Sequence, residues 1–349
     1  MENTDTPRLG VALIGAGMIA KTHVAALSAS RSRVRLDTIV SQRPERAKYL
    51  TEYYADSPPL FTNDLSSVTD NTGVEVVIVA TPPSVRIELI EALAQAGKHI
   101  LLEKPVARNV AEALHVVEIC ERAGVTLGVL FQHRMRAASI AAAQLMASGT
   151  LGKLAHVEIA APLWRPQSYY DELERGTYER DGGGVLITQA IHTIDLALSL
   201  TGPVSSVQAM IATTPLHQME AEDFAVAGLR FSSGAVGSLV TSTASYPQAS
   251  EIIALHCEHG SLRLGSKTLD IAWHDGRCQQ DKFDTDQPTE NGPVLASYEN
   301  HQGVIENFID AVVLGHDPIV TGRTALASHR LIEAIEASSR TGSRVDLEH

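Results

Sequence analysis

Cysteine and basic residues are both scarce in this chain of 349 residues. The three cysteines, Cys120, Cys257 and Cys278, are irregularly spaced, which argues against a disulfide framework and predicts a cytoplasmic protein. There are 28 Lys and Arg against 41 Asp and Glu, giving a formal net charge of −13. Such a surface repels nucleic acid and acidic membranes unless a basic patch intervenes, and the sequence has none. We therefore expect neither as a partner.

Long apolar runs, repeats and low-complexity tracts are also lacking. The polar N-terminus lacks the apolar core of a signal peptide, and no apolar run approaches the roughly 18 residues of a membrane span. Hydrophobic residues at 44% and charged residues at 20% are typical of a globular protein, and the length predicts two domains. The ending at 347–349, Leu-Glu-His, has the form of a tag remnant and is left out of the fold prediction.

Strand and helix patterns alternate over residues 1–132. Strands are expected at 9–14, 34–40, 74–80, 99–102 and 125–131, with helices at 18–30, 84–96 and 109–123. Short buried strands that alternate with helices indicate a doubly wound parallel sheet. This part of the chain is predicted to be a Rossmann dinucleotide-binding domain in an α/β protein.

The pattern changes over residues 133–346. Successive strand-like segments are expected at 154–161, 204–213, 223–231, 235–243, 251–257 and 261–264, with helices at 137–148, 184–200, 299–314 and 322–340. Short turns at 232–234 and 258–260 join consecutive strands as hairpins do. We expect an α+β domain with a large, mostly antiparallel sheet that binds substrate and supports oligomerisation.

The loop Gly15-Ala16-Gly17-Met18-Ile19-Ala20 lies directly between the first strand and the first helix. Its G-x-G-x-x-A pattern lets backbone N–H groups approach a pyrophosphate at the helix N-terminus. Gly15, Gly17, Met18 and Ile19 are therefore candidates for cofactor binding. A tight turn without a ligand and a methyltransferase loop remain alternatives, whereas a Walker loop is excluded because no G-K-[ST] follows.

The residue at the end of the second strand should contact the ribose of a dinucleotide. Asp37 has the expected spacing, but it lies inside the run 34–40 and is interpreted as structural. Ser41 occupies the strand end and leaves room for a phosphate, with which Arg43 can pair. This favours NADP over NAD, although Arg43 can also be an ordinary exposed residue at a helix start.

The segment Glu103-Lys104-Pro105 follows the strand 99–102, at the edge of the sheet where ligands of open α/β folds bind. Here the sequence resembles the Gfo/Idh/MocA (glucose–fructose oxidoreductase and inositol dehydrogenase) family over nearly its whole length. The resemblance rests on G-A-G-M-I-A at 15–20, A-T-P-P at 80–83, A-G-K-H-I-L-L-E-K-P at 96–105, G-G-G-V-L-I-T-Q-A-I-H-T-I-D at 182–195, F-I-D-A at 308–311 and T-G-S-R-V at 341–345.

The resemblance implies that Lys104 is the central catalytic lysine, and that Thr81, Pro82, Glu103 and Lys104 lie at the cofactor. An ammonium beside the reacting oxygen stabilises a developing alkoxide. The structural alternative for Lys104 is a surface lysine at a strand end. The family also implies a homodimer or homotetramer, with a large sheet at the subunit interface.

The expected helix 184–200 carries Thr188, His192 and Asp195 at spacings that share a face. Comparison with the family places His192 at its histidine, which suits a general base for a carbinol proton. Thr188 stands where the family commonly has Asp, so this sequence departs from the full Lys–Asp–His set at that position. A structural histidine is the alternative for His192, and a structural role is favoured for Asp195.

Aromatic and basic residues precede this helix. Trp164, Arg165 and Tyr169 lie in a loop that related sequences use at the substrate, and they suit a hydroxylated ring. Packing of the loop on the sheet is the alternative. His133-Arg134 can equally face substrate or hold structure, and Arg86, where the family often has His, is given no role.

No metal is expected. The run His256-Cys257-Glu258-His259 passes from strand into turn, where alternate residues face opposite ways, so one ion cannot collect all four ligands.

The leading functional prediction is an NAD(P)-dependent dehydrogenase acting on a CH–OH group of a sugar, sugar acid or cyclitol. Lys104 and His192 take the charge-stabilising and acid–base roles. One alternative is a hydrolase or lyase that oxidises transiently and retains its NAD. Another is a non-catalytic cofactor-binding sensor, which would need neither Lys104 nor His192.

Overall fold

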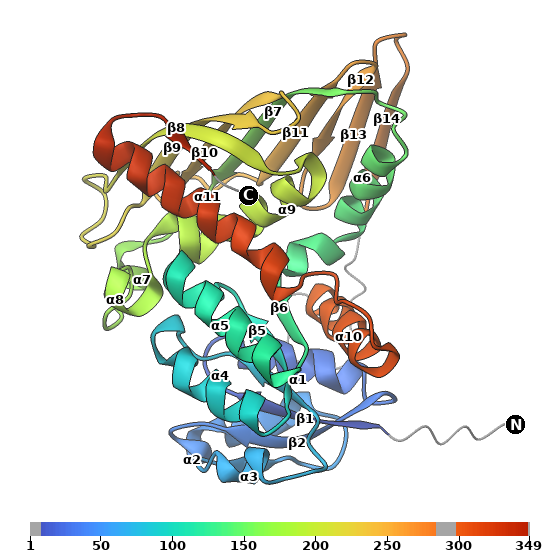
Figure 1. Cartoon of the computed structure of the whole chain (residues 1–349), viewed down its shortest axis with the longest axis vertical. Coiled ribbons are helices and arrows are strands. Elements are labelled where there is room, and N and C mark those ends of the chain that lie inside the picture. Colours follow the sequence, from blue (N-terminus) through green and yellow to red (C-terminus); the bar gives the residue numbers. More distant parts are fainter. Residues whose placement is uncertain (1–7, 284–297, 348–349) are drawn as a thin grey trace, which may run out of the picture. The chain divides into compact units, whose positions relative to one another are not determined.

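The structure is a computed structural model that describes residues 8–283 and 298–347. Its described residues form two compact units (Figure 1), one with residues 8–106, 114–132 and 298–324, the other with residues 107–113, 133–283 and 325–347. The units are interleaved along the chain, whereas the expected domains 1–132 and 133–346 are contiguous. Of the expected tag remnant at 347–349, Glu348 and His349 lie outside the described residues.

The first unit is built on a six-stranded sheet in the order β3-β2-β1-β4-β5-β6, with every neighbouring pair parallel. Its strands are β1 (Leu9–Ile14), β2 (Val34–Val40), β3 (Leu60–Thr62), β4 (Val76–Val79), β5 (His99–Glu103) and β6 (Leu127–Leu130). The predicted parallel Rossmann sheet is confirmed. The edge strand β3 was not predicted, because three residues are too few for a periodic pattern.

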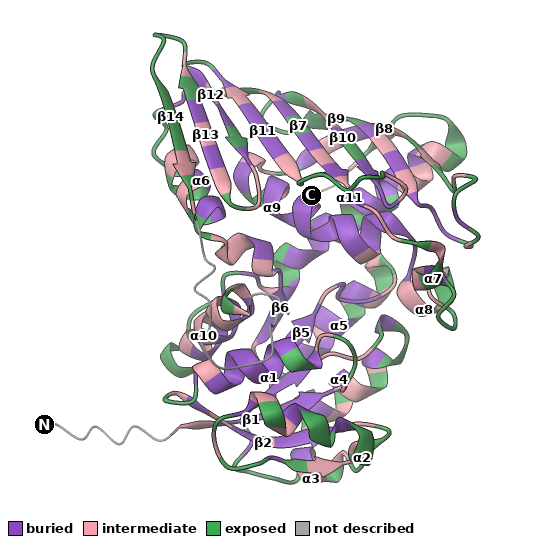
Figure 2. Cartoon of the chain, turned by 180° about the vertical axis from the view of Figure 1, so that it is seen from behind, coloured by how far each residue is buried: buried purple, intermediate pink, exposed green. Residues whose placement is uncertain are grey.

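Helices cover this sheet on both faces. They are α1 (Ala20–Ala29), α2 (Pro44–Ala47), α3 (Ser66–Thr69), α4 (Arg86–Gln95), α5 (Val110–Ala123) and α10 (Glu299–Leu314). Figures 1 and 2 show α4 and α5 on one face and α1 on the other, with the strands between them buried. This double cover explains why β4 is apolar at every position instead of alternating.

Helix α10 belongs to the first unit although it comes late in the chain. It packs on α1 and contacts β5 and β6. Phe308 of α10 is fully buried over Gly128 of β6, where an added Cβ would come within 2.5 Å of the Phe308 ring. Gly128 is therefore the residue that lets α10 approach the sheet.

The second unit is built on a nine-stranded sheet in the order β14-β13-β12-β11-β7-β10-β9-β8-β15. Its strands are β7 (Leu154–Pro162), β8 (Val204–Ala212), β9 (Phe224–Phe231), β10 (Val236–Ser242), β11 (Ile252–Cys257), β12 (Gly260–Leu264), β13 (Thr268–Trp273), β14 (Cys278–Lys282) and β15 (Val345–Asp346). Strands β7 and β10 are parallel, and the other described pairs are antiparallel. The expected mostly antiparallel sheet and both hairpins are confirmed. Strands β13, β14 and β15 were not predicted; β14 has a polar sequence, and β15 has only two residues.

Several helices belong to this unit. They are α6 (Ala137–Ala147), α7 (Gln167–Tyr170), α8 (Tyr178–Asp181), α9 (Ile191–Thr201) and the C-terminal part of α11 (Gly322–Thr341). α6 contacts β12 and β13, and α9 contacts β7. In β7 the side chains of Val157 and Ile159 are buried, while Glu158 between them is exposed. The sheet therefore buries one face, and its other face carries Glu158 together with the exposed apolar side chains of Met210, Val236 and Val240.

The helical stretch 178–201 departs from two expectations. It has 24 residues, and an 18-residue window within it has a mean hydropathy of 1.3, so by length and composition alone it could cross a membrane, contrary to the sequence prediction. However, 78% of the apolar window is buried inside the protein, as in the core helix of a globular domain. The predicted single helix 184–200 is also interrupted, because Leu186–Ala190 forms a π-helical turn before α9. Such turns are frequent at functional sites.

Candidate active site

A cleft of about 800 Å³ opens in the first unit at the carboxyl ends of its central strands. Six of the predicted cofactor-binding residues line it: Gly15, Gly17, Ser41, Arg43, Thr81 and Pro82. Met18 and Ile19 lie beside it at the start of α1, where Met18 is 70% exposed, and they are not among the lining residues. The sequence therefore located the cleft, though not every residue around it.

The glycine loop has the shape that a dinucleotide requires. Gly15 has φ +106°, and a Cβ there would lie 2.7 Å from the carbonyl oxygen of Ala80. An added Cβ at Gly17 would meet nothing within 4 Å, so its backbone borders open space. The buried hydroxyl of Thr81 has no hydrogen-bond partner among the described residues. These features fit a bound NAD(P) whose phosphates approach the loop.

The part of this cleft that follows β2 carries two arginines. Arg43, which the sequence predicted, and Arg46, which it did not, both line the cleft and are exposed, and Asn63 lies with them. The backbone N–H of Arg43 donates to Ser41 Oγ at 3.3 Å. Asp37 is in the middle of β2 and accepts a hydrogen bond from Arg35 at 2.8 Å, which agrees with its structural interpretation.

Lys104 directly follows β5, and the residue before it is buried. The Glu103 carboxylate meets Nε2 of His23, from α1, at 2.9 Å. Burial alone would raise the pKa of Glu103, but the hydrogen bond and charge of His23 bring that pKa down to about 2, helped by His301 and Lys104. Burial lowers the pKa of His301 to about 4, so its ring is neutral near pH 7. Glu103, expected at the cofactor, thus has its carboxylate engaged with His23.

Arg86 holds the backbone around Lys104. Its side chain is buried at the start of α4 and donates hydrogen bonds to the carbonyl oxygens of Thr81, Glu103 and Pro105. Burial lowers the pKa of Arg86 to about 10, which leaves it charged at neutral pH. Arg86 therefore ties the loop after β4 to the loop after β5. The sequence analysis assigned no role to Arg86, because it stands where the family often has His, and no local pattern marks an arginine that binds distant carbonyls.

In the second unit His192 is 8% exposed, at the start of α9. Its ring stacks on that of His133, with centroids 4.6 Å apart and planes at 26°. One turn along α9, Asp195 is buried and accepts two hydrogen bonds from Arg134, at 2.7 and 2.8 Å. This supports the structural interpretation of Asp195, and it gives Arg134 a holding role. The adjacent residues 133 and 134 thus both brace α9.

The other predicted substrate residues form a chain of contacts. The Thr188 hydroxyl donates to the carbonyl of Gly184 at 2.5 Å and meets the Gln189 amide oxygen. The Gln189 amide N–H donates to the Tyr169 hydroxyl at 3.1 Å, and the guanidinium of Arg165 lies 5.6 Å from the centre of the Tyr169 ring. The structure therefore brings Thr188, Tyr169 and Arg165 together through Gln189, to which the sequence analysis assigned no role.

Trp164 and Arg165 rest on a buried pair that the sequence analysis missed. The indole of Trp164 lies 5.9 Å from the His217 ring, and His217 Nε2 is 2.9 Å from the carbonyl oxygen of Arg165. His217 Nδ1 in turn contacts the Asp223 carboxylate at 2.7 Å, with both residues buried. The pair of His217 and Asp223 orients the loop that carries Trp164 and Arg165. Trp164 can therefore pack on His217 and also contact a substrate.

The helix that carries Thr188 begins on a buried carboxylate. Glu222 accepts hydrogen bonds from the backbone N–H groups of Gly184 and Leu186, each at 3.0 Å. A Cβ at Gly184 would lie 1.8 Å from the Glu222 carbonyl oxygen, so only glycine fits there. Burial and the charge of Glu222 raise the pKa of Glu336 to about 7.

Two family models together match most of the chain. The model described as "Oxidoreductase family, NAD-binding Rossmann fold" matches residues 9–131, and that of the "GFO/IDH/MocA C-terminal domain" matches residues 140–263. The sequence comparison therefore identifies the same two parts as the structure: an NAD-binding Rossmann sheet, followed by the C-terminal domain of this family.

Individual relatives agree with these models. The WlbA dehydrogenase of Bordetella pertussis, solved with NADH and UDP-GlcNAcA, is 32% identical and has a TM-score of 0.81, with 98% of this chain and 99% of that chain covered. The D-apiose dehydrogenase of Paraburkholderia graminis is 28% identical, over 99% of this chain and 91% of that protein. The scyllo-inositol 2-dehydrogenase (NADP(+)) IolW of Bacillus subtilis is 24% identical, over 99% and 97%.

Proposed function

The chain belongs to the GFO/IDH/MocA family of oxidoreductases, and on that premise we propose that it is an NAD(P)-dependent dehydrogenase acting on a CH–OH group of a sugar, sugar acid or cyclitol. The observation that carries this proposal is the dinucleotide cleft at the carboxyl edge of the six-stranded sheet, with Lys104 at the end of β5 on the same edge. Ligands of open α/β sheets bind along that edge.

The substrate class is supported by the relatives. Two of them are named for D-apiose and scyllo-inositol, and a third was solved with UDP-GlcNAcA; all three compounds are polyhydroxylated. The network of Thr188, Gln189, Tyr169 and Arg165 offers hydroxyl, amide, aromatic and cationic groups, which suit such a molecule. We take a small polyhydroxylated compound as the substrate.

The chemistry is assigned to two residues. When bound, the nicotinamide supplies the acceptor for the hydride that leaves the carbinol carbon. Lys104 stabilises the negative charge that develops on the carbinol oxygen, and His192 accepts the hydroxyl proton. Thr188 has no useful basicity, so it serves only to position a partner.

For the cofactor we propose NADP. Arg43 and Arg46 give the ribose end of the cleft two cations, and Ser41 places no carboxylate where a 2′-phosphate would lie. The relatives include a protein named for NADP(+) and one solved with NADH. The relatives therefore do not favour either cofactor, and the proposal of NADP depends on the residues of this cleft.

A homo-oligomer, a dimer or tetramer in the cytoplasm, is the assembly that we propose. Val236 and Val240 of β10 and Met210 of β8 are apolar and 42% to 56% exposed on the second unit's sheet. Light scattering with mass determination on the purified chain checks this, and a monomer at micromolar concentration would exclude it.

The proposed activity is tested by a screen of polyols, sugar acids and cyclitols with each cofactor, followed by absorbance at 340 nm. We expect cofactor reduction with at least one of them. Lys104→Met should lower turnover about 100-fold or more while cofactor affinity stays within about tenfold. Cofactor that co-purifies with the protein and shows no net redox change during turnover would instead indicate transient oxidation by a hydrolase or lyase. Cofactor binding without turnover of any compound would indicate a sensor.

A further inference from the structure

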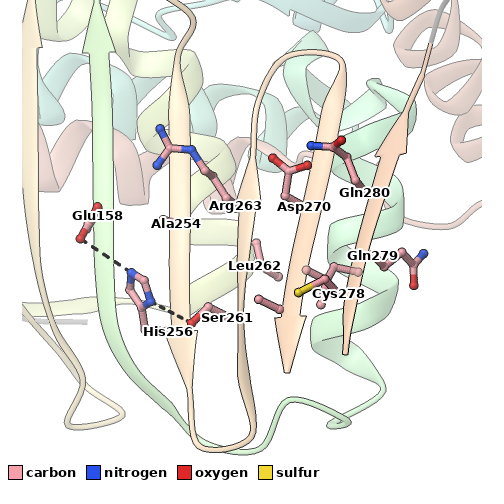
Figure 3. A pocket seen from close by; sticks show the side chains of 12 residues that line it. Glu158, Ala254, His256, Ser261, Leu262, Arg263, Asp270, Cys278, Gln279 and Gln280 are labelled. Carbon is pink, nitrogen blue, oxygen red and sulfur yellow. Dashed lines mark hydrogen bonds and ion pairs between the residues drawn. The ribbon is translucent and has the colours of Figure 1, made fainter. Parts of the chain in front are cut away.

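Two histidines and a carboxylate meet on the face of the nine-stranded sheet opposite the buried Val157 and Ile159. His156 of β7 lies in register with His256 of β11, and their rings stack with centroids 5.2 Å apart. Glu158, two residues after His156, projects from the same face of β7. Nε2 of His256 lies 3.7 Å from Oε1 of Glu158 (Figure 3).

We propose that His156, Glu158 and His256 bind a divalent transition-metal ion, with zinc as the expected one. One ligand atom from each residue lies within 4.8 Å of the other two. Tetrahedral zinc with bonds of about 2.0–2.2 Å needs ligand atoms about 3.3–3.6 Å apart. The three side chains are exposed or partly exposed, so small χ rotations close this difference.

The hydrogen bond of His256 supports a ligand role. Its Nδ1 lies 2.9 Å from the hydroxyl of Ser261, on the neighbouring strand β12 (Figure 3). With Nδ1–H donating to this hydroxyl, the lone pair of Nε2 is left facing Glu158. Metal-binding histidines generally donate their second N–H in this way, which fixes the tautomer and the ring orientation.

The surroundings leave a place for a fourth ligand. Glu158, His256 and Ser261 line a hollow of about 470 Å³ that continues over β12 and β13 toward Cys278. Two imidazoles and one carboxylate with an open fourth position are a ligand set that zinc commonly takes. Val236, which lies in register with His156, is on the face that we propose for assembly, so the fourth ligand in the oligomer would be water held in the hollow. The ion would join β7 to β11 near the middle of the sheet order.

This site differs from the one that the sequence argument rejected. In the run 256–259, Cys257 is buried on the opposite face from His256, so those four residues indeed cannot share an ion. The partners of His256 come instead from β7, about 100 residues earlier. Strand register, which the sequence pattern does not give, brings them together.

Isothermal titration calorimetry with zinc chloride alone tests the proposal, on the full chain without added histidines. We expect one ion per chain and a higher melting temperature in its presence. His156→Asn and His256→Asn should each weaken binding at least about tenfold, and Ser261→Ala by about tenfold, as a residue that orients a ligand does. Cobalt in place of zinc should give the visible absorption of a tetrahedral ion.

His259→Asn is the matched control, because His259 is an exposed histidine three residues from His256 and outside the cluster. It should bind zinc as the unaltered chain does. If titration with zinc releases or absorbs no heat, or if zinc binds equally to all of these variants, the proposal is wrong. His256 and Glu158 then form only a surface ion pair, with His156 stacked on His256. Melting curves without zinc identify any variant that fails to fold, and Glu158→Gln then provides an independent test.

Discussion

The guanidinium of Arg86 donates a hydrogen bond of 2.6 Å to the main-chain carbonyl of Glu103, the residue before Lys104. The same side chain donates to Thr81, which lines the dinucleotide cleft. One buried cation therefore sets the backbone on two sides of the proposed nicotinamide position.

Arg86→Leu should destabilise the protein by about 3 kcal/mol, because it leaves several buried carbonyl oxygens without a donor. Arg86→Lys keeps the charge but loses the fork of donors, so it should fold yet lower kcat at least about tenfold, with a smaller effect on the KM for cofactor. Denaturant unfolding and steady-state kinetics measure both. Arg323→Leu removes an exposed pair with Glu121 and is the control, with an expected cost below about 1 kcal/mol. Unchanged kcat in Arg86→Lys would show that Arg86 serves the fold alone.

Arg43→Ala and Arg46→Ala should each raise the KM for NADP about tenfold or more and leave the KM for NAD nearly unchanged, because only NADP carries the 2′-phosphate. Initial rates with both cofactors provide the measurement. Lys48→Ala is a suitable control, since Lys48 is exposed, pairs with Glu45 and does not line the cleft. A wild-type enzyme that strongly prefers NAD would contradict the cofactor proposal.

His192→Asn should lose about 100-fold or more in alcohol oxidation, together with the rise in rate around neutral pH that a histidine base produces. Thr188→Val should cost much less. The pH profile of kcat/KM for the three proteins is the deciding measurement. An inflection that persists in His192→Asn would transfer the base role to Lys104.

Glu336→Gln should stabilise the protein at pH 8 and have little effect at pH 5. Burial and the nearby charge of Glu222 raise the pKa of Glu336 from 4.5 to about 7. The folded state therefore binds this proton more tightly than the unfolded state, and the free energy of unfolding falls as pH rises between these two values. Gln mimics the protonated acid, so only the pH 8 melting temperature should increase. Glu88→Gln, at an exposed position of α4 and not among the groups that act on Glu336, should show no such difference between the two pH values.

Local patterns predicted much of this molecule. The glycine loop, the strand end at Ser41 and the E-K-P segment are all encoded within a few consecutive residues, and the structure places Gly15, Gly17, Ser41 and Thr81 around one cleft. Apolar periodicity likewise predicted every long strand of the first sheet.

What was missed depends on contacts between distant residues. Arg86 acts through carbonyls about 20 residues away, His23 reaches Glu103 over 80 residues, and His156 meets His256 only through strand pairing. The π-helical turn at Leu186–Ala190 is also invisible to a pattern that assumes 3.6 residues per turn.

Helix α10 is synthesised long after the sheet of the unit to which it belongs. The nucleotide-binding sheet is complete once β6 has left the ribosome, yet the helix that covers α1 is Glu299–Leu314, near the end of the chain. Domains generally fold as units during translation, the N-terminal one first. Here we expect the nascent first unit to expose the apolar surface beneath α10 while the whole second sheet is being made. A truncated product that ends before α10 should therefore be prone to aggregation, however complete its cofactor loop.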